Sequence, residues 1–361
     1  MKGSVTEITI AKRKSRRGGE RPTIADVALR AGVSPMTVSR VINGETGVVA
    51  RKRDLVQNAI SELGYVPNSA ARTLAGSGLC RLVLLHDNPS AGFMSALLMG
   101  SLEGAHQVDA QLQVEPMDPT EPINVLCARL KWSQANGLLL TAPICDDASV
   151  VAGLVESGFA VSRIASTQKL PDSHDVFIDD EAASYAMTKH LLTLGHRRIG
   201  FIQGPANQAV SALRAAGYAR AMDEAGIQSD QALIVIGDFT YRSGMTAADA
   251  LLGLEQPPTA IFACNDDMAA AAIAAAHRRR LDVPQDVSVC GFDDTAIATT
   301  IWPEITTIRQ PVAEMARLAT IALAEAVRAR NSRLPQIEAH QHLAFQLIRR
   351  ASDAPPSSSS A

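Results

Sequence analysis

Apolar residues recur at helical spacing in short segments near the N-terminus. The first segment follows Thr23, a favourable N-cap residue with Asp26 three positions later, and it ends at Gly32. A second helix is expected directly after Ser34, and a third at about residues 50–63. The pattern therefore predicts two helices joined by a short turn, followed by a third helix.

The second helix is expected to have two distinct faces. At about 100° per residue, the apolar residues Val38, Val41 and Ile42 lie on one side. The opposite side carries Met36, Arg40 and Asn43. The apolar side is expected to pack against the other helices, which leaves the polar side free to enter the major groove of DNA. The arginine has the geometry to pair with guanine, although arginine is also common on an exposed helix surface.

From residue 81 onward, short apolar runs alternate with amphipathic helical stretches. The candidate strands are residues 82–85, 112–117, 137–142, 160–165, 176–179, 198–204, 233–239, 260–266 and 287–294. This alternation predicts an α/β fold with parallel sheets flanked by helices. So many strands favour two lobes with a cleft between them, and a TIM barrel is the alternative.

Charge is divided unevenly along the chain. The net charge is −3 over 361 residues, but residues 1–78 carry 13 Lys and Arg against 6 Asp and Glu (+7), and the remainder carries 21 against 31 (−10). A basic unit on an acidic body is typical of a nucleic-acid-binding module joined to a domain for another ligand. For residues 1–21 a solvated basic arm is the alternative.

Several classes of site are disfavoured. No apolar run approaches the ~20 residues of a membrane span, and no apolar core of an export signal follows the first charges, so we expect a cytoplasmic protein without a membrane partner. The 5 cysteines are scattered and never spaced as CxxC, which indicates buried thiols rather than a disulfide framework or a zinc site. Neither GxGxxG nor GxxxxGK[ST] is present, so no cofactor is expected.

Polar residues gather where predicted strands end. They form the segments HDN (86–88), CND (264–266) and GFDD (291–294). In α/β folds such ends build ligand sites, and carboxylates and amides suit a ligand rich in hydroxyl groups. Each residue taken alone is also compatible with a simple turn.

The stretches TIADVALRAGVSPMTVSRVING and ELGYVPNSAARTLAG resemble the DNA-binding headpiece of the lactose/galactose repressor (LacI/GalR) family. The resemblance implies that Pro35, Met36 and Arg40 read base edges of a double-stranded operator. Proline and methionine offer no side-chain hydrogen bonds, so their contacts would be apolar. The residues that match positions holding phosphates or the local fold are Thr23, Ser34, Thr37, Ser39 and Asn43.

The start of the third helix departs from the family pattern. The family usually has a serine there that caps the helix and contacts phosphate, whereas this chain has Val49, followed by Arg51, Lys52 and Arg53. The cap is expected to be lost, and the basic residues are candidates to replace the phosphate contact.

Residues 67–76 resemble the hinge helix of the family. A helix this short is not stable alone, because nucleation costs more than so few hydrogen bonds return. The resemblance implies that two such helices pair in the minor groove, where Leu74 wedges a base step open and Asn68 and Ala71 contact the groove. The alternative is a plain linker in which Leu74 is an incidental exposed residue.

The body, to about residue 350, resembles the periplasmic-binding-protein-like effector domain of the same family. The resemblance implies Phe239 as a stacking aromatic and Arg214 as an effector-holding arginine. The other implied effector residues are Asn265, Asp293, Gln310 and, less directly, Asp87, Asn88 and Arg163. His190 and His196 are interpreted as structural residues rather than metal ligands.

These observations predict an ordered series of domains. The expected parts are a basic disordered arm (1–21), a helix-turn-helix domain (22–66), a hinge helix and linker (67–79), an effector domain of two lobes (80–350) and a disordered tail (351–361). The tail has no leucine heptads, so the expected assembly is a homodimer on a pseudo-palindromic operator.

The leading hypothesis is a sequence-specific repressor of carbohydrate-metabolism genes whose operator affinity changes when a small sugar-like effector binds. A solute-binding protein of a transporter shares the two-lobed architecture, but it would not need a DNA-binding segment such as residues 22–76. An enzyme would have to use Asp266, Asp267, Asp293 and Asp294 as acid and base, and no nucleophile is paired with them. Purines and phosphorylated sugars remain open as effectors.

Overall fold

The computed structural model describes residues 22–42, 47–65, 80–87, 90–118, 120–228, 230–332 and 340–357. The chain divides into two compact units, Met1–Leu79 and Cys80–Ala361. Asn43, Asn68, Ala71, Leu74 and Asn88, which the sequence proposes as contact residues, lie outside the described residues.

The first unit is helical. It contains α1 (Ile24–Ala31), α2 (Pro35–Ile42) and α3 (Ala50–Leu63), as predicted. Thr23 and Asp26 form the expected capping box, in which the Thr23 backbone N–H donates to Asp26 Oδ2 at 2.8 Å and Asp26 N–H donates to Thr23 Oγ1 at 3.4 Å. Gly32 ends α1 at φ 65°, a left-handed conformation that glycine adopts without a steric penalty.

The three helices share one small core. The buried residues are Val27, Ala28, Ala31, Val38, Val41, Val56, Ala59 and Tyr65. Because every helix contributes to this cluster, α2 is held by its apolar face against α1 and α3. Its other face is therefore left at the surface.

The second unit begins with a six-stranded sheet in the order β11-β5-β4-β3-β1-β2. Its strands are β1 (Arg81–His86), β2 (Gln111–Pro116), β3 (Gly137–Leu140), β4 (Ala160–Ile164), β5 (Ser173–Phe177) and β11 (His340–His342), and all paired neighbours are parallel. The helices around it are α5 (Ala91–Gln107), α6 (Ile123–Trp132), α7 (Ala148–Glu156) and α13 (Val312–Asn331), with the 3-10 turn η1 (Ile144–Asp146). We call this sheet with its helices the first lobe.

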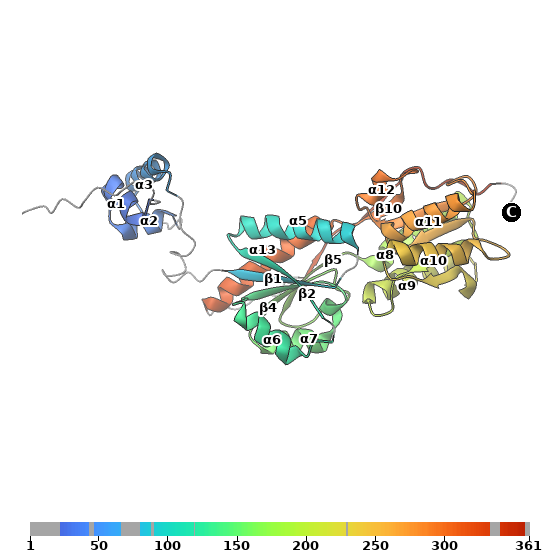
Figure 1. Ribbon diagram of the computed structural model, residues 1–361, viewed down its shortest axis with the longest axis horizontal. Coiled ribbons are helices and arrows are strands. Elements are labelled where there is room, and N and C mark those ends of the chain that lie inside the picture. The colour runs from blue at the N-terminus through green and yellow to red at the C-terminus, as the bar shows by residue number, and fades with distance from the viewer. Residues whose placement is uncertain are drawn as a thin grey trace, which may run out of the picture. The chain divides into compact units, whose positions relative to one another are not determined.

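Both faces of the first sheet are covered (Figure 1). Helices α5 and α13 lie on one face, and α6 and α7 on the other. Successive side chains of a strand point to opposite faces, so Leu82 and Leu84 join the core with α5, whereas Val83 and Leu85 join the core with α6 and α7. Burial on both sides explains why the strands are nearly continuous apolar runs.

The second lobe is built on another six-stranded sheet, in the order β12-β10-β9-β8-β6-β7. Its strands are β6 (Ile199–Gln203), β7 (Ile234–Ile236), β8 (Ala260–Ala263), β9 (Ser288–Asp293), β10 (Thr306–Arg309) and β12 (Gln346–Ile348). Only β12 among these described strands is antiparallel, to β10. Its helices are α8 (Asp180–Leu194), α9 (Ala209–Glu224), α10 (Tyr241–Leu252), α11 (Asp266–Arg278) and α12 (Ile297–Thr300), with the 3-10 turn η2 (Gln231–Leu233).

The two lobes exchange segments. The chain passes from β5 in the first lobe to α8 in the second, returns from β10 to α13, and crosses again from β11 to β12. Each predicted strand overlaps one of the observed strands, whereas β10, β11 and β12 have no counterpart among the predicted strands. The two-lobed prediction is confirmed, and the TIM barrel is excluded by the two separate sheets.

Helix α5 approaches α13 unusually closely. A Cβ atom on Gly104 would lie 2.7 Å from the Arg317 carbonyl oxygen, and one on Gly100 would overlap the backbone of Ala313. These glycines, one helical turn apart, let the two backbones touch. The start of α5, which carries pocket residues, is thereby fixed on a helix that follows β10.

The expectation of a disordered tail from residue 351 is wrong for its first residues. Ser352 and Asp353 are buried. Ser352 Oγ donates to the Val289 carbonyl at 2.5 Å and accepts from Thr306 N–H at 2.9 Å, and Asp353 Oδ2 lies 2.8 Å from His190 Nε2. The composition of the tail predicts disorder, because composition does not show which residues find hydrogen-bond partners in the fold. Here the partners lie on β9, β10 and α8.

Candidate functional site

The second helix of the front unit presents a polar face to solvent. Val38 and Val41 are buried, whereas Met36 is 70% exposed and Arg40 is also exposed. Ser34 Oγ accepts a hydrogen bond from Thr37 N–H at 3.2 Å and caps the helix at its start. The face is therefore available to a partner.

The remaining predicted contact residues of this unit that the structure describes lie at the starts of α1 and α2 and along α2. Thr23 and Pro35 are exposed at the starts of α1 and α2, and Thr37 and Ser39 are partly buried on α2. Ser34 is exposed just before α2.

The start of α3 lacks a side-chain cap and carries basic residues, as the sequence predicts. Val49 is exposed and makes no side-chain cap. Arg51 and Lys52 are exposed in the first turn, and Arg53 is partly buried. Cationic side chains at this end of α3 are suited to phosphate groups.

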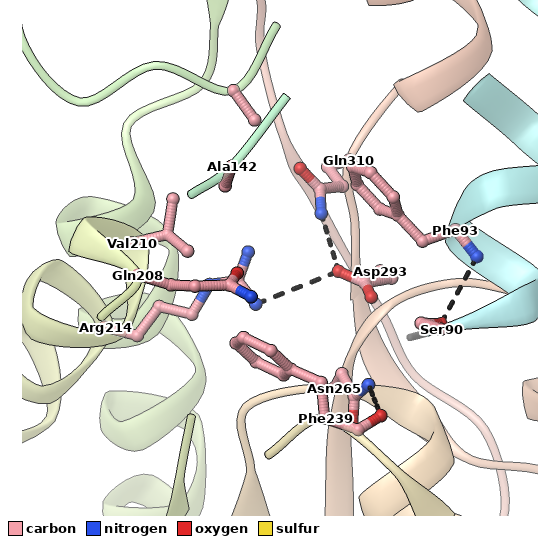
Figure 2. Close-up of a pocket in the computed structure, with 11 residues that line it drawn as sticks. Ser90, Phe93, Ala142, Gln208, Val210, Arg214, Phe239, Asn265, Asp293 and Gln310 are labelled. Carbon is pink, nitrogen blue, oxygen red and sulfur yellow. Dashed lines mark hydrogen bonds and ion pairs between the residues drawn. The ribbon is translucent and has the colours of Figure 1, made fainter. Parts of the chain in front are cut away.

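A pocket lies between the two lobes of the second unit (Figure 2). It contains about 380 Å³ of empty space, part of which is open to solvent. Its lining residues come from helix starts and from the carboxyl ends of parallel strands, as expected for this fold class. They are Ser90, Phe93, Ala142, Ala165, Gln208, Val210, Arg214, Phe239, Asn265, Asp293 and Gln310.

Arg214 is the cation of the pocket. It projects from α9 and is buried. Its Nε–H donates to Asp180 Oδ1 at 2.7 Å, its Nη1–H donates to the Cys264 carbonyl at 2.5 Å, and its guanidinium lies 3.6 Å above the ring centre of Phe292. These contacts fix the plane of the guanidinium and leave the Nη2 hydrogens for a ligand.

Asp293 faces Arg214 across the pocket. It ends β9 with φ 110°, a sparsely populated conformation for a residue with a side chain. Its Oδ1 accepts a hydrogen bond from Gln310 Nε2 at 2.6 Å and lies 3.9 Å from Arg214 Nη1. Burial raises the pKa of Asp293 to about 7, although Arg214 and the Gln310 bond act in the opposite direction. A ligand that supplies donors would favour the ionised form.

Phe239 supplies an aromatic surface. It is buried at φ 65° after β7, and its carbonyl accepts from Asn265 Nδ2 at 2.9 Å. Asn265 also caps α11, because its Oδ1 accepts from Met268 N–H at 2.9 Å. A Cβ on Gly204 would lie 2.7 Å from Cε1 of the Phe239 ring, so only glycine leaves room for this aromatic side chain.

Arg163 and Asp87 do not line this pocket. Arg163 is fully buried in β4, with Nε donating to Ser173 Oγ at 3.1 Å, Nη1 to the Cys145 carbonyl at 2.8 Å, and Nη2 2.7 Å from Asp175 Oδ1. Because its donors are taken by protein acceptors, it holds the first lobe together and does not contact a ligand. Asp87 is exposed and lines a neighbouring hollow.

The structure adds pocket residues that sequence reasoning missed. They are Ser90, Phe93, Ala142, Ala165, Gln208 and Val210. The two alanines follow β3 and β4, so the rule that sites lie at strand ends identifies their positions, although alanine itself carries no chemical signal. Ser90 was detectable as the N-cap of α5, which accepts from Phe93 N–H at 3.4 Å.

The structure also bears on the other classes of site. All five cysteines are buried and free, as predicted. Within the described ranges, no group of three or more His, Cys, Asp or Glu side chains is placed to hold a metal ion. No helix in the part of the chain that the structure describes is long and apolar enough to cross a bilayer.

Comparison with protein-family models gives two matches. Residues 23–68 match the bacterial regulatory proteins of the lacI family, and residues 188–352 match a periplasmic binding protein-like domain. Among curated proteins, the chain is 35% identical over 302 residues to the HTH-type transcriptional regulator DegA of Bacillus subtilis, covering 82% of this chain and 88% of the relative. It is 34% identical over 309 residues to the HTH-type transcriptional regulator CelR of Thermobifida fusca, covering 82% and 91%.

Solved structures show the same likeness. A lac repressor dimer bound to operator and the anti-inducer ONPF matches 93% of this chain and all of its own chain, with a TM-score of 0.71 and 27% identity. A complex of the transcriptional regulator CelR with cellobiose matches 92% of this chain and 100% of its own, with a TM-score of 0.68 and 30% identity.

Proposed function

Because this chain belongs to the lacI family of bacterial regulatory proteins, and is thus a DNA-binding repressor under effector control, we propose that it governs carbohydrate-metabolism genes through the pocket between its lobes. One observation carries the proposal. Five residues that the sequence assigns to effector binding come from separate segments of the chain and line one pocket. They are Arg214, Phe239, Asn265, Asp293 and Gln310.

We propose that α2 reads the operator in the major groove. Arg40 pairs with a guanine, a contact worth about 1–3 kcal/mol of base discrimination, while Pro35 and Met36 make apolar contacts. The exposure of Met36 and Arg40 opposite buried Val38 supports this orientation. The residues that hold phosphates or the local fold are Thr23, Ser34, Thr37, Ser39 and Asn43.

Residues 67–79 connect the reading unit to the effector domain. We propose that Asn68, Ala71 and Leu74 enter the minor groove when two hinge helices pair, and that these helices lose their pairing when the effector domain changes shape. A coupling of about 1–3 kcal/mol between effector and operator is typical of such switches.

The repressor acts as a homodimer in this proposal, as the lac repressor does in its operator complex. Met99 and Leu102 on α5 and Val114 on the edge strand β2 are exposed apolar residues on the first lobe. We infer that this face contributes to the contact between the two chains.

We propose a mechanism of effector binding in which both lobes hold the ligand. Arg214 and Asp293 chelate neighbouring hydroxyl groups, and Phe239 stacks on the apolar face of a sugar ring. Ser90 and Phe93 reach the same ligand from the first lobe, which supports coupling between binding and the relative position of the lobes.

We further propose that the chain is not an enzyme and that it acts in the cytoplasm. The curated relatives include HTH-type transcriptional regulators. Asp266, a candidate acid or base, accepts hydrogen bonds from Thr307 Oγ1 at 2.6 Å and from Thr295 N–H at 2.7 Å, which supports a structural role.

Fluorescence anisotropy with labelled duplex tests this function. The full chain is titrated with its own promoter region and with a shuffled duplex at moderate ionic strength, with and without a panel of sugars. We expect a preference for the promoter that one of the sugars changes. Equal affinity for both duplexes under every condition would refute the proposal.

A further inference from the structure

Two alanines form the first-lobe side of the pocket. Ala142 follows β3 and Ala165 follows β4, and both line the pocket, as Figure 2 shows for Ala142. An alanine side chain is too short to adapt to a ligand, so the width of the pocket on this side depends on where the backbone of the two loops lies. We call these loops, residues 141–147 and 165–168, the first-lobe wall.

The backbone of the first-lobe wall is held in a sparsely populated conformation. Ala165 has φ 57°, in the left-handed region. A residue with a side chain keeps such a conformation only where the surrounding structure fixes it. The contacts that fix this wall therefore contribute to the shape of the pocket.

One buried arginine holds both loops. Arg163 Nη1 donates to the Cys145 carbonyl at 2.8 Å, three residues after Ala142. Its Nη2 donates to the Gln168 carbonyl at 2.7 Å, three residues after Ala165. Arg163 is fully buried, so these bonds form in a medium of low dielectric constant, where they are strong. A shift of the guanidinium would move both loops.

The guanidinium is anchored by a carboxylate on the next strand. Asp175 on β5 is 1% exposed, and its Oδ1 lies 2.7 Å from Arg163 Nη2. Its other oxygen, Oδ2, lies 2.6 Å from Nδ1 of His340 on β11. A carboxylate only accepts hydrogen bonds, so this ring nitrogen carries the hydrogen. Because both oxygens are bonded, the direction in which Asp175 holds the arginine is fixed.

His340 belongs to a strand that leaves the first lobe. Strand β11 pairs with β5, with His340 opposite Asp175, and the chain then crosses to β12 in the second lobe. The series from Arg163 through Asp175 to His340 thus connects the first-lobe wall to a crossover between the lobes.

From these contacts we propose that Arg163 is a positioning residue for effector binding, and that His340 supports the effector affinity by holding Asp175 in place. Neither side chain contacts the effector. The inference rests on the proposed function, because it takes the pocket between the lobes as the effector site.

Hydrogen–deuterium exchange of the full chain without any ligand tests this positioning. His340→Ala removes the bond to Asp175, so amide exchange in residues 144–147 and 165–168 is expected to be at least about fivefold faster than in the wild type. Equal exchange in the two proteins would overturn the inference. A change in only one of the two loops would overturn the role of Arg163, which holds both.

His342→Ala is the matched control for this experiment. His342 lies on the same strand, and its ring lies 5.6 Å from the ring of Phe177. Its replacement is expected to leave exchange in the first-lobe wall unchanged. An equal rise in both variants would show that loss of β11, and not of the bond to Asp175, loosens the wall, and would overturn the assignment of His340.

A conservative replacement separates positioning from a general loss of packing. His340→Asn places an amide N–H near the position of Nδ1, so it is expected to restore slow exchange in the first-lobe wall. Exchange in α10 and α11 of the second lobe is expected to be the same in every variant. If His340→Asn exchanges as fast as His340→Ala, the hydrogen bond is not the cause and the assignment fails.

Ligand binding by the same variants separates this inference from the function on which it rests. Glucose, galactose, cellobiose and trehalose are titrated calorimetrically, and a sugar that binds the wild type is expected to bind His340→Ala about threefold to tenfold more weakly. Promoter preference without sugar is expected to be unchanged, because the front unit is unaltered. Equal sugar affinity would overturn the inference. Loss of promoter preference in the wild type, or binding by none of these sugars, counts against the proposed function, and the exchange experiment then still decides the positioning.

Discussion

Ser90 donates a hydrogen bond from its Oγ to Oδ2 of Asp267 at 2.7 Å, and this bond joins the two lobes beside the pocket. Ser90 precedes α5 in the first lobe, whereas Asp267 lies in the first turn of α11 in the second. Gly92 lies close to the second lobe as well, since a Cβ there would be 2.8 Å from Thr295 Cβ. The start of α5 thus docks directly on the opposite lobe.

Removal of this inter-lobe acceptor is expected to weaken effector binding. Asp267→Ala loses a hydrogen bond worth about 0.5–1.5 kcal/mol, which corresponds to an affinity reduced by about twofold to tenfold. Calorimetric titration with a sugar that binds the wild type measures the change. Asp267→Asn, which keeps an acceptor oxygen, is expected to retain most of the affinity, and equal binding by wild type and Asp267→Ala would show that the bond does not contribute.

Loss of the arginine on α2 is expected to remove operator preference. Arg40→Ala should reduce the difference in binding free energy between promoter and shuffled duplex by about 1–3 kcal/mol. Arg30→Ala is the control, because Arg30 is an exposed arginine of the same unit that pairs with Glu62, and its replacement removes the same charge. Both variants should show weaker nonspecific binding that depends on salt. Equal promoter preference in the two variants would contradict the role of Arg40.

Stability is expected to depend on pH through Asp293. Burial raises its pKa from 3.8 to about 7, so the folded protein holds a proton there that the unfolded chain releases above pH 3.8. The resulting stabilisation is complete below the unfolded pKa and is lost as pH rises through about 7. Asn at this position does not titrate.

Urea denaturation of wild type and Asp293→Asn at pH 5 and pH 8 measures this effect. The variant is expected to gain stability relative to the wild type as pH rises, because only the wild type then buries a charge. A difference in unfolding free energy that is the same at both pH values would show that Asp293 does not titrate in this range.

The C-terminal segment is expected to stabilise the second lobe. Asp353 receives hydrogen bonds from Thr306 Oγ1 and, at 2.8 Å, from His190 Nε2, and these bonds hold its pKa below the ordinary value although burial acts to raise it. Asp353→Ala should lower the free energy of unfolding by about 1–3 kcal/mol, since it leaves buried partners unpaired. Chemical denaturation measures the loss.

A surface aspartate provides the comparison for this variant. Asp230 pairs with Arg198 at 2.9 Å, but its side chain is 42% exposed. Asp230→Ala should cost clearly less stability than Asp353→Ala, because exposed ion pairs contribute little to folding. Equal losses in Asp353→Ala and Asp230→Ala would mean that the buried contacts of the C-terminal segment add nothing to stability.

Regular elements were predictable from the sequence where local chemistry decides them. The capping box at Thr23 and the left-handed Gly32 depend on neighbouring residues, and both occur as expected. The buried strands were predictable for the same reason, because each coincides with an apolar run in the sequence. Strands β10, β11 and β12 are short and form by pairing with strands that are distant in the sequence, so no local sequence pattern predicts them.

The pocket was predictable in part. Polar residues at strand ends, such as Asn265 and Asp293, converge because parallel strands end at one edge of a sheet. Arg163 was misplaced because β4 is buried on both faces, so no alternation indicates where its side chain points. The order of Ser352 was missed because it depends on single hydrogen bonds to β9 and β10.

The segment exchange between the lobes has a consequence for synthesis on the ribosome. The first sheet takes its edge strand β11 and its covering helix α13 from residues made after most of the second lobe. A nascent chain that ends before residue 340 therefore carries an unpaired β5 edge, and one that ends before α13 also leaves bare the part of the apolar sheet face, over β3, β4 and β5, that α13 covers. Proteins interrupted during translation are expected to be cleared by proteases or to aggregate, since neither lobe matures until its neighbour has been made.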